Sequence, residues 1–375
     1  MKAFIIYTTV ANSFFYNLAR ALNHLGNKVY LLNAPLHVSK GFGDCCQVVN
    51  LDENCIADFL KEKQINGLLI WNGSNNLFFM NIFKDNGVKI WFFENGYLPA
   101  TLQMNLGGVN AEASYNTEST EELYTYTFTK SDIELNNFVV QNVSKLNLKS
   151  YLLSKLKQAG ILNALVDIIR VASSKMKKKL LSLKFKYGYS GSIEDFVEKP
   201  FLLLPLQVNN DTQIIQNSNF KDMYQILDTL APLLINSGYD LVVKEHPEET
   251  SYVNYQKYSK YDHVRIVKNV DLNTLIEKAT CVITVNSSVG FQAIQKNKKV
   301  ITLGNSFYNS APGVFKCNLF SGNFLQVLEE AINNTTLSKE QNKYVNYFND
   351  EIFITGNWKS PDKKLIKECV DRLLV

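Results

Sequence analysis

Lys244, His246 and Pro247 are the residues of this chain whose types and spacing most favour chemistry. They end the apolar run at 240–244, and Pro247 restricts the backbone of His246 to extended conformations. Because side chains two apart on a strand share one face, a cation and an imidazole are expected side by side. Such a pair can hydrogen-bond a phosphate or protonate a leaving phosphate oxygen. The alternative is a histidine that only completes the hydrogen bonds of a strand end.

A second polar stretch, Asn286, Ser287 and Ser288 followed by Gly290, separates a predicted strand from a predicted helix. One serine is accounted for as the helix N-cap. Two hydroxyls together with the free amides of a helix N-terminus would form an anion cradle. Gly290 would let a ligand approach the backbone closely. We therefore predict a phosphate site here.

Amide and carboxylate side chains crowd the segment that follows the apolar run at 200–205, namely Gln207, Asn209, Asn210, Asp211 and Gln213. A solvated surface loop would have the same composition. However, α/β proteins bind their ligands at the carboxyl ends of strands. We predict that Gln207, Asn209, Asp211 and Gln213 recognise a sugar or a nucleotide.

One carboxylate, Glu94, ends the strongly apolar run at 91–93 and is followed by Asn95 and Gly96. Burial beside such a run would raise the pKa of the carboxyl group, which suits a general base or a nucleophile. An acid that caps the following turn is the alternative. Asn95, Gly96 and Asn110 are expected to position a substrate, although the stretch around Asn110 is also compatible with a simple turn.

Strand-like and helix-like segments alternate at both ends of the chain, as a parallel sheet with crossover helices requires. Predicted strands lie at 2–8, 28–32, 67–71, 88–93, 200–205, 240–244, 264–267, 281–284 and 300–303, and predicted helices at 13–25, 56–63, 77–83, 220–237, 272–278 and 288–296. This pattern predicts an α/β fold with domains at 1–118 and 199–350. Residues 351–375 are expected to form a C-terminal helix that packs back on the body.

Between the two domains, 119–198 has helical periodicity and is predicted to be a helical linker or insertion. Its lysines at 175–186 are interleaved with apolar residues. They indicate either a solvated linker helix or an amphipathic element that rests on an anionic membrane surface. Because no apolar run reaches the roughly 18 residues of a membrane span, we expect a cytoplasmic protein, with peripheral association to the inner face of the inner membrane as an option.

Composition narrows the class of protein. The 375 residues, 46% of them hydrophobic, suffice for two domain cores, and a net charge of +4 gives no strong field for nucleic acid. The six cysteines match neither a metal-binding pattern nor a disulfide scaffold. With no Asp-x-Asp pair placed to hold a divalent ion on a diphosphate, no metal and no cofactor is predicted.

Taken in chain order, these stretches resemble the bacterial capsular polysaccharide synthesis family, especially its KpsS-type proteins, which are similar to the KpsC-type capsule enzymes. The resemblance rests on 92–99 (Phe-Phe-Glu-Asn-Gly-Tyr-Leu-Pro), 108–110, 205–214, His246 with Pro247, 284–290 and 304–308. The ordered set is specific, whereas a His-Pro pair alone is weak.

The resemblance implies a GT-B-like architecture, with two Rossmann-like domains facing a central cleft. It implies transfer of a β-linked Kdo sugar from CMP-Kdo to a lipid-linked glycan or phospholipid acceptor, with the CMP contacted by His246, Ser287 and Ser288 of the C-terminal domain. It also implies a catalytic acid from the Glu-x-Gly segment. Related proteins commonly carry a second acid where this chain has Asn95, which leaves Glu94 as the catalytic candidate of a retaining transferase.

Two rival classes share some of these features. A CDP-polyol phosphotransferase of the teichoic-acid type would also use a His-Pro turn and paired serines. A non-catalytic capsule export or assembly component is the alternative outside enzymes. A transferase that uses a UDP- or GDP-sugar is a further possibility.

Overall fold

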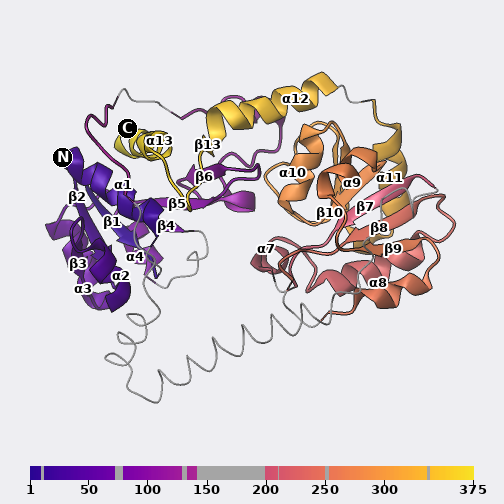
Figure 1. The fold of residues 1–375 in the computed structure, drawn as a ribbon, viewed down its shortest axis with the longest axis horizontal. Coiled ribbons are helices and arrows are strands. Elements are labelled where there is room, and N and C mark those ends of the chain that lie inside the picture. The colour runs from indigo at the N-terminus through magenta and orange to yellow at the C-terminus, as the bar shows by residue number, and fades with distance from the viewer. Residues whose placement is uncertain are drawn as a thin grey trace, which may run out of the picture. The chain divides into compact units, whose positions relative to one another are not determined.

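The computed structural model describes residues 1–9, 12–71, 79–128, 133–141, 199–209, 211–249, 253–335 and 338–375. These residues form two compact units. The first unit contains the described residues of 1–115, 126–141 and 348–375, and the second contains those of 116–125 and 199–347. Each unit is built around its own sheet (Figure 1).

The first unit has a seven-stranded sheet in the order β13-β6-β5-β4-β1-β2-β3. Its parallel strands are β1 (Ala3–Tyr7), β2 (Lys28–Leu32), β3 (Gln47–Val49), β4 (Gly67–Trp71) and β5 (Lys89–Asn95). Two further strands extend the sheet beyond β5, namely β6 (Thr101–Asn105), which is antiparallel to β5, and β13 (Ile354–Thr355), which is antiparallel to β6. The chain therefore returns to this sheet near its C-terminus.

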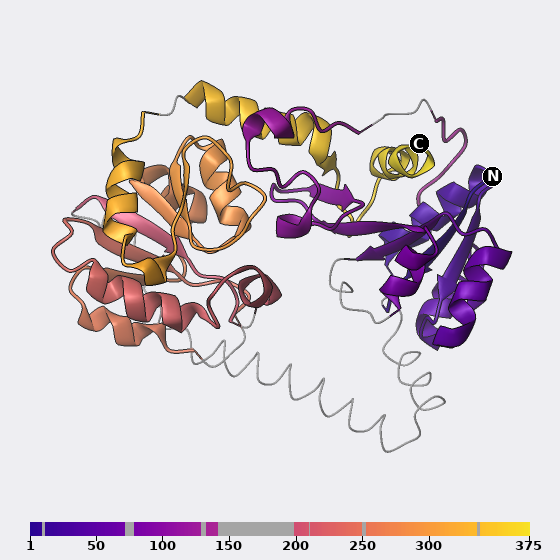
Figure 2. The same ribbon diagram turned by 180° about the vertical axis from the view of Figure 1, so that it is seen from behind.

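Helices α1 (Ser13–His24) and α13 (Lys363–Leu374) pack together in one core of the first unit. Asn12 caps α1 by accepting the Phe15 N–H at 2.8 Å, and α13 buries an apolar stripe that includes Ile366 and Val370. Figure 2 shows the yellow α13 beside the indigo N-terminal elements. The remaining helical segments of the unit are α2 (Leu36–Phe42), α3 (Glu53–Glu62), α4 (Met80–Asp85), η2 (Asn110–Glu112) and η6 (Phe348–Ile352).

The second unit has a six-stranded sheet in which every neighbouring pair is parallel. Its order is β12-β11-β10-β7-β8-β9, formed by β7 (Phe201–Pro205), β8 (Asp240–Lys244), β9 (Val264–Val267), β10 (Cys281–Thr284), β11 (Lys299–Thr302) and β12 (Val314–Lys316). In chain terms this is the order 3-2-1-4-5-6 of a doubly wound Rossmann fold, and the order reverses between β7 and β10.

The helical elements of the second unit are α5 (Thr120–Leu123), α7 (Thr212–Asn217), α8 (Met223–Leu233), η4 (Tyr255–Lys260), α9 (Leu272–Lys278), α10 (Ser288–Gln295), η5 (Leu319–Ser321), α11 (Phe324–Asn333) and α12 (Ser338–Tyr347). The side chains of Asp211, Asp222, Asp271 and Ser287 cap α7, α8, α9 and α10 by accepting backbone N–H groups. These caps satisfy amides that a helix leaves without partners.

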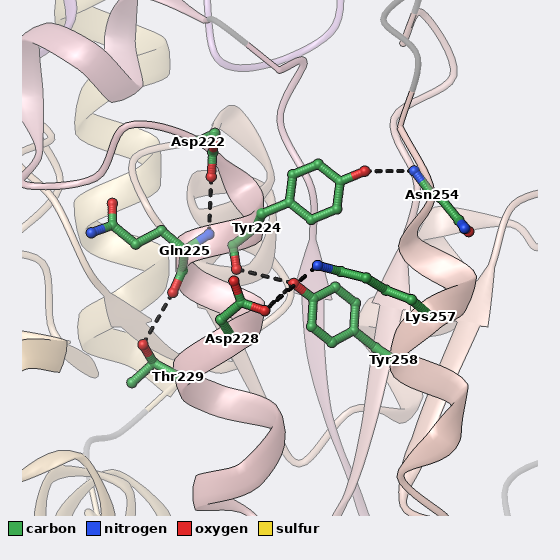
Figure 3. Close-up of polar contacts among 8 residues, drawn as sticks. All are labelled: Asp222, Tyr224, Gln225, Asp228, Thr229, Asn254, Lys257 and Tyr258. Carbon is green, nitrogen blue, oxygen red and sulfur yellow. Dashed lines mark hydrogen bonds and ion pairs between the residues drawn. The ribbon is translucent and has the colours of Figure 1, made fainter.

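Helix α8 is joined to η4 by a polar cluster (Figure 3). The Tyr258 hydroxyl donates to Asp228 at 2.6 Å, and the Lys257 ammonium lies 3.7 Å from the same carboxylate. The Tyr224 hydroxyl accepts the Asn254 N–H at 2.5 Å. The cluster therefore fixes the chain shortly after it leaves the polar turn that follows β8.

The prediction of an α/β fold with two Rossmann-like units is confirmed, and most predicted strands form within two residues of their expected ends. The structure adds β3, β6, β12 and β13, which the sequence analysis did not predict. It ends α8 at Leu233, four residues before the predicted end. Across the described ranges, no helix is both long and apolar enough to span a bilayer. Most of the predicted linker at 119–198, including 175–186, lies outside the described residues.

Candidate functional site

The candidate residues of the second unit lie where three neighbouring strands end. Gln207 follows β7, Lys244 ends β8 and precedes His246, and Asn286 follows β10. Strands β7 and β10 are the pair between which the strand order reverses. Doubly wound sheets bind their ligands at this point, outside the carboxyl ends of the strands. The sheet order therefore brings three separate sequence motifs to one edge.

Gln207 and Asn286 join the two loops at this edge. The Gln207 Nε2 donates to Asn286 Oδ1 at 3.1 Å, and the Asn286 backbone N–H donates to Gln207 Oε1 at 3.4 Å. The Asn286 Nδ2 donates to the Gln213 carbonyl at 2.9 Å. Both side chains are buried, so hydrogen bonds between them satisfy groups that would be costly to leave unpaired. The structure therefore gives Gln207 and Asn286 a positioning role, whereas the sequence suggested contact with a ligand.

Asp211 and Gln213 are also engaged within the protein. Asp211 caps α7 through the Gln213 N–H at 2.9 Å and accepts from Gln207 Nε2 at 3.2 Å. The Gln213 Oε1 accepts from Asn217 at 3.0 Å. These contacts hold the loop that follows β7 against the start of α7.

Asn209 differs from its neighbours in the same loop. Its backbone N–H donates to Glu249 Oε2 at 2.6 Å, and its buried Oδ1 atom has no hydrogen-bond partner. A buried acceptor without a partner is costly and in native proteins is usually explained by a water or a ligand. Asn209 is therefore the member of this loop best suited to contact a bound molecule.

The Lys244 ammonium is held by main-chain carbonyls. It donates to Lys268 at 2.5 Å and to Glu245 at 3.3 Å. Burial lowers the pKa of Lys244, and the nearby Lys268 acts in the same direction. The Lys244 ammonium is thus anchored at the end of β9. The sequence predicted a cation beside His246 but did not predict this anchoring.

His246 is a half-buried imidazole with an assignable tautomer. Its Nδ1 accepts the Glu248 backbone N–H at 3.1 Å, so the ring hydrogen of the neutral form is on Nε2. Burial lowers the pKa of His246, against the opposing influence of Glu248, Glu249 and Asp211. A neutral imidazole with an Nε2–H group can donate a hydrogen bond to a phosphate oxygen. The acidic neighbours make this site less cationic than the sequence suggested.

Ser287 and Ser288 have different roles at the start of α10. The Ser287 hydroxyl caps the helix through the Val289 N–H at 3.3 Å, and its carbonyl accepts from the Tyr308 hydroxyl at 2.6 Å. Ser288 is half-buried, and within the described part of the chain its hydroxyl makes no hydrogen bond. The capping role thus accounts for one serine, and the Ser288 hydroxyl at the helix N-terminus is not used by the cap.

The structure gives a reason for glycine at position 290 that differs from the predicted approach of a ligand. A Cβ atom at this position would lie 2.8 Å from Cζ of Tyr308 and would also overlap the Tyr308 hydroxyl. The close approach that Gly290 permits is therefore made by a buried tyrosine. This contact supports the turn that presents Ser288.

Two cavities of the second unit lie at opposite edges of its sheet. The larger, about 550 Å³, is lined by Lys199, Asp240, His263 and their neighbours at the amino ends of the strands, away from the candidate site. The smaller, about 290 Å³, is lined by residues at the carboxyl ends of β11 and β12, including Gly304 and Thr302. The buried Thr302 hydroxyl has no hydrogen-bond partner. Together with Asn209 Oδ1, it is the second buried polar atom without a partner at the carboxyl edge of this sheet.

In the first unit, Glu94 lies at the carboxyl end of β5 and is half-buried. Its Oε1 atom accepts from the Asn95 backbone N–H at 2.7 Å and from Asn95 Nδ2 at 3.0 Å. The Asn95 Oδ1 accepts from the indole N–H of Trp358 at 2.6 Å. Asn95 therefore contacts the carboxylate directly and is itself held by a residue 263 positions later.

Gly96 and Asn110 stabilise the same region of the first unit. Gly96 begins the turn into β6 and donates to the Thr101 carbonyl at 2.7 Å, and a Cβ atom there would clash with Thr101. Asn110 is buried in a left-handed conformation and exchanges two hydrogen bonds with Gln103, at 3.0 and 3.1 Å. Gln103 also donates to the Asn95 carbonyl at 2.6 Å. The structure thus gives Asn110 a supporting role behind the Glu94 turn.

Sequence reasoning missed Trp358, Glu249 and Thr302. Nothing in a tryptophan near the end of the chain signals a contact with Asn95, because the pairing depends on β13 joining the sheet. Glu249 gave no local signal either, because its contact with the Asn209 N–H joins two loops that are 40 residues apart. Among the described residues, no group of three or more His, Cys, Asp or Glu side chains is close enough to hold a metal ion.

The topology and the position of the polar loops define a two-unit α/β protein of the Rossmann-like class. Residues 76–317 match the family described as "Capsule polysaccharide biosynthesis protein". Since the match covers more than half of the chain, the protein belongs to this family.

Individual relatives are more distant. Protein FixF of Sinorhizobium fredii is 26% identical over 253 residues, which are 67% of this chain and 51% of FixF. Capsule polysaccharide export protein KpsS of Escherichia coli is 26% identical over 125 residues, 30% of this chain and 32% of KpsS. The chain thus spans about half the length of FixF.

Two solved structures align with most of this chain at low sequence identity. The β-Kdo 2,7 transferase of KpsC from Thermosulfurimonas dismutans is 16% identical, with a TM-score of 0.44 over 88% of this chain and 90% of that one. UDP-GlcNAc 2-epimerase from Methanocaldococcus jannaschii is 12% identical, with a TM-score of 0.33 over 93% of this chain and 99% of that one.

Proposed function

We propose that this protein is a glycosyltransferase of capsule biosynthesis that takes a Kdo-type sugar from CMP-Kdo and transfers it to a lipid-linked glycan or a phospholipid. Membership of the capsule family supports the process. The observation that carries the proposed chemistry is the carboxyl edge of the second sheet. There the loop after β7 is bonded both to the loop after β8 and to the loop after β10, which leads into α10 and Ser288.

In this proposal the phosphate of the donor lies at the N-terminus of α10. The Ser288 hydroxyl and the main-chain amides of the first turn donate to its oxygens, and the helix dipole favours its negative charge. His246 donates through Nε2 to the phosphate oxygen that leaves the anomeric carbon. Donors aimed at an oxygen that gains charge in the transition state lower the barrier. Asn209, with its unpartnered acceptor, contacts a hydroxyl or amino group of the donor.

Glu94 is the proposed catalytic carboxylate. In a retaining double displacement its carboxylate attacks the anomeric carbon as the bond to the phosphate oxygen breaks and CMP leaves. The acceptor hydroxyl then forms the new bond to that carbon, loses its proton to solvent and releases the Glu94 carboxylate. The anomeric configuration of the product, measured by NMR, checks this assignment, because inversion in a single step would contradict it.

The donor experiment compares CMP-Kdo, CDP-glycerol and UDP-GlcNAc with the same purified chain. We expect release of CMP from CMP-Kdo, with no turnover of the other two donors. Turnover of CDP-glycerol alone would identify the rival polyol phosphotransferase, and no turnover of any donor would favour a non-catalytic export or assembly component. We also propose that no metal or other cofactor is needed. A loss of activity with chelator that magnesium restores would refute that part.

Where the protein acts is also part of the proposal. An acceptor made on lipid places the enzyme in the cytoplasm, in contact with the inner face of the inner membrane. The basic stretch at 175–186 is the proposed contact with anionic lipid.

A further inference from the structure

The side chain of Asn95 bridges two groups that lie far apart in the sequence. Its Nδ2 donates to Glu94 Oε1 at 3.0 Å, while its Oδ1 accepts from Trp358 Nε1 at 2.6 Å. An indole N–H can only donate and an ionised carboxylate can only accept. The residue between them must therefore be both an acceptor and a donor. A primary amide meets this requirement, whereas aspartate could not donate to Glu94 and would repel it.

Trp358 is itself held in place by three contacts within the first unit. The strand β13 that precedes it pairs with β6 through Ile354 and Thr355. Gly356 donates to the Ala100 carbonyl at 2.8 Å, and its φ of 148° and its tight contact with Leu365 require glycine there. The Trp358 ring lies against Trp71 with centroids 4.7 Å apart. The indole N–H is thus presented to Asn95 by a well-anchored segment.

The other side of Asn95 is fixed as well. Its carbonyl accepts from Gln103 Nε2 at 2.6 Å, and the Gln103 side chain is fully buried. The Gln103 Oε1 accepts from the Tyr115 hydroxyl at 2.5 Å. The main chain at Asn95 therefore cannot move freely, and the remaining freedom of its side chain is the rotation that Trp358 restricts.

We propose that Trp358 and Asn95 are positioning residues that hold the Glu94 carboxylate in its reactive orientation. This inference rests on the proposed function, since it gives Glu94 the catalytic role. It assigns a part in the reaction to the C-terminal segment, which the sequence placed in no site. An orientation fixed before the substrate binds contributes directly to the rate of the chemical step.

The test begins with Trp358→Phe, which keeps a ring against Trp71 and removes the N–H donor. We expect kcat for transfer from CMP-Kdo to fall about tenfold with KM for the donor unchanged, because misplacing a reacting group affects the transition state more than donor binding. The matched control is Trp71→Phe, the same substitution in the ring that packs against Trp358. It removes no hydrogen bond to Asn95 and is expected to retain kcat. Equal losses in both variants would show that the effect comes from packing and would overturn the inference.

A double-mutant cycle separates a shared role from two independent ones. Asn95→Ala and Trp358→Phe act on the same carboxylate, so the double variant should be no slower than Asn95→Ala alone. Multiplied losses would contradict the inference, as would full kcat in Trp358→Phe. Thermal unfolding of each variant checks that the fold is retained.

A readout that does not depend on activity keeps this inference distinct from the proposed function. The chain has three tryptophans, so three indole N–H signals are expected in a ¹⁵N-labelled sample, and Trp358→Phe identifies one. That signal should move in Asn95→Ala and exchange faster with solvent, because the N–H loses its acceptor. In Trp71→Phe the signal also shifts, since a neighbouring ring changes, but its slow exchange with solvent should be retained. If the signal moves but the unsubstituted protein transfers from no donor, the proposed function fails while the hydrogen bond stands. If transfer occurs and the signal does not respond to Asn95→Ala, the positioning role fails.

Discussion

At the scale of single residues, His246 is the side chain whose chemistry the structure defines most closely. The Glu248 N–H occupies Nδ1, so the ring can donate only through Nε2 in its neutral form. This is a narrower role than the general acid suggested by the sequence. A histidine with one nitrogen already committed can orient and stabilise a leaving phosphate without giving up its own proton.

Replacing His246 by Ala tests this role. We expect a loss of about 2–4 kcal/mol of transition-state stabilisation, the usual effect of removing one donor from a developing anion. The measurement is kcat/KM with CMP-Kdo. His263→Ala is the matched control, because His263 is a partly buried histidine of the same unit whose Nε2 bonds the Ala231 carbonyl at the opposite edge of the sheet. Similar turnover in the two variants would refute the role of His246.

The pH dependence of stability follows from the same burial. The folded protein lowers the pKa of His246 below its usual value of 6.5, so the unfolded chain takes up the proton first as the pH falls. The contribution of neutral His246 is therefore complete above about pH 6.5 and is lost as the pH falls through the folded pKa. Below pH 6.5, the urea midpoint of the native protein should fall relative to that of His246→Gln. A difference that stays constant from pH 8 to 5 would contradict this.

At the scale of elements, the loops after β7 and β10 act as one structure. The Gln207–Asn286 bonds cross between them, and the Asn286–Gln213 bond ties in the start of α7. Most of the amide groups that the sequence predicted to contact a ligand therefore form hydrogen bonds within the protein. The groups that the proposed function assigns to the donor are the few left over, namely Ser288, Asn209 with its unpartnered Oδ1 atom, and the Nε2–H of His246.

The contact between α10 and Tyr308 provides a test at this scale. Gly290→Ala places a methyl group against the buried Tyr308 ring, and overpacking of this kind costs about 1–3 kcal/mol. Tyr308→Phe should relieve only part of the cost, because Cζ as well as the hydroxyl lies too close to the new Cβ. Urea unfolding of the two single variants and the double variant gives the coupling energy.

The control for this substitution is Gly43→Ala, where a Cβ atom would meet nothing closer than 3.4 Å. It is expected to leave stability nearly unchanged. The contact with Tyr308 is not the reason for glycine at position 290 if Gly290→Ala is equally harmless. The same conclusion follows if Tyr308→Phe does not change the effect of Gly290→Ala on stability.

At the scale of the whole molecule, the chain forms two units, and its C-terminal stretch folds with the first of them. Helix α13 covers α1, and the Lys2 ammonium donates to the carbonyls of Leu374 and Val375 at 2.8 and 3.0 Å. The same return of the chain brings Trp358 to Asn95. Both ends of the sequence therefore contribute to one unit.

The basic stretch outside the described residues remains a prediction at this scale. Replacing its lysines by Gln should abolish binding to vesicles that contain anionic lipid, since each lysine near such a surface contributes about 1 kcal/mol. The lysines are Lys175, Lys177, Lys178, Lys179, Lys184 and Lys186. Sedimentation with vesicles at low and high salt measures the effect, and transfer to a water-soluble acceptor should be unaffected.

An equal number of exposed lysines elsewhere serves as the control, namely Lys28, Lys61, Lys84, Lys221, Lys260 and Lys339. Their replacement should leave vesicle binding largely intact. Equal losses in the two variants would mean that overall charge, and not the stretch at 175–186, attracts the protein to the membrane.

The sequence by itself determined the α/β class, most of the strands and the edge at which the polar motifs gather. These follow from local periodicity and from the rule that parallel strands end on one side, as shown by β8, β9 and β10, whose bounds match the predicted ones. Short strands such as β13, with two residues, carry too little periodicity to be predicted.

Only the tertiary structure decided which polar side chains form hydrogen bonds within the protein and are therefore not available to a ligand. Gln207 and Asn286 lie 79 residues apart and Asn95 and Trp358 lie 263 apart, so no local pattern encodes either pair. The physical reason is that a buried amide takes whichever partner the packed fold places within hydrogen-bond distance. The residue type determines whether a group can donate or accept a hydrogen bond, and the fold determines which partner it bonds.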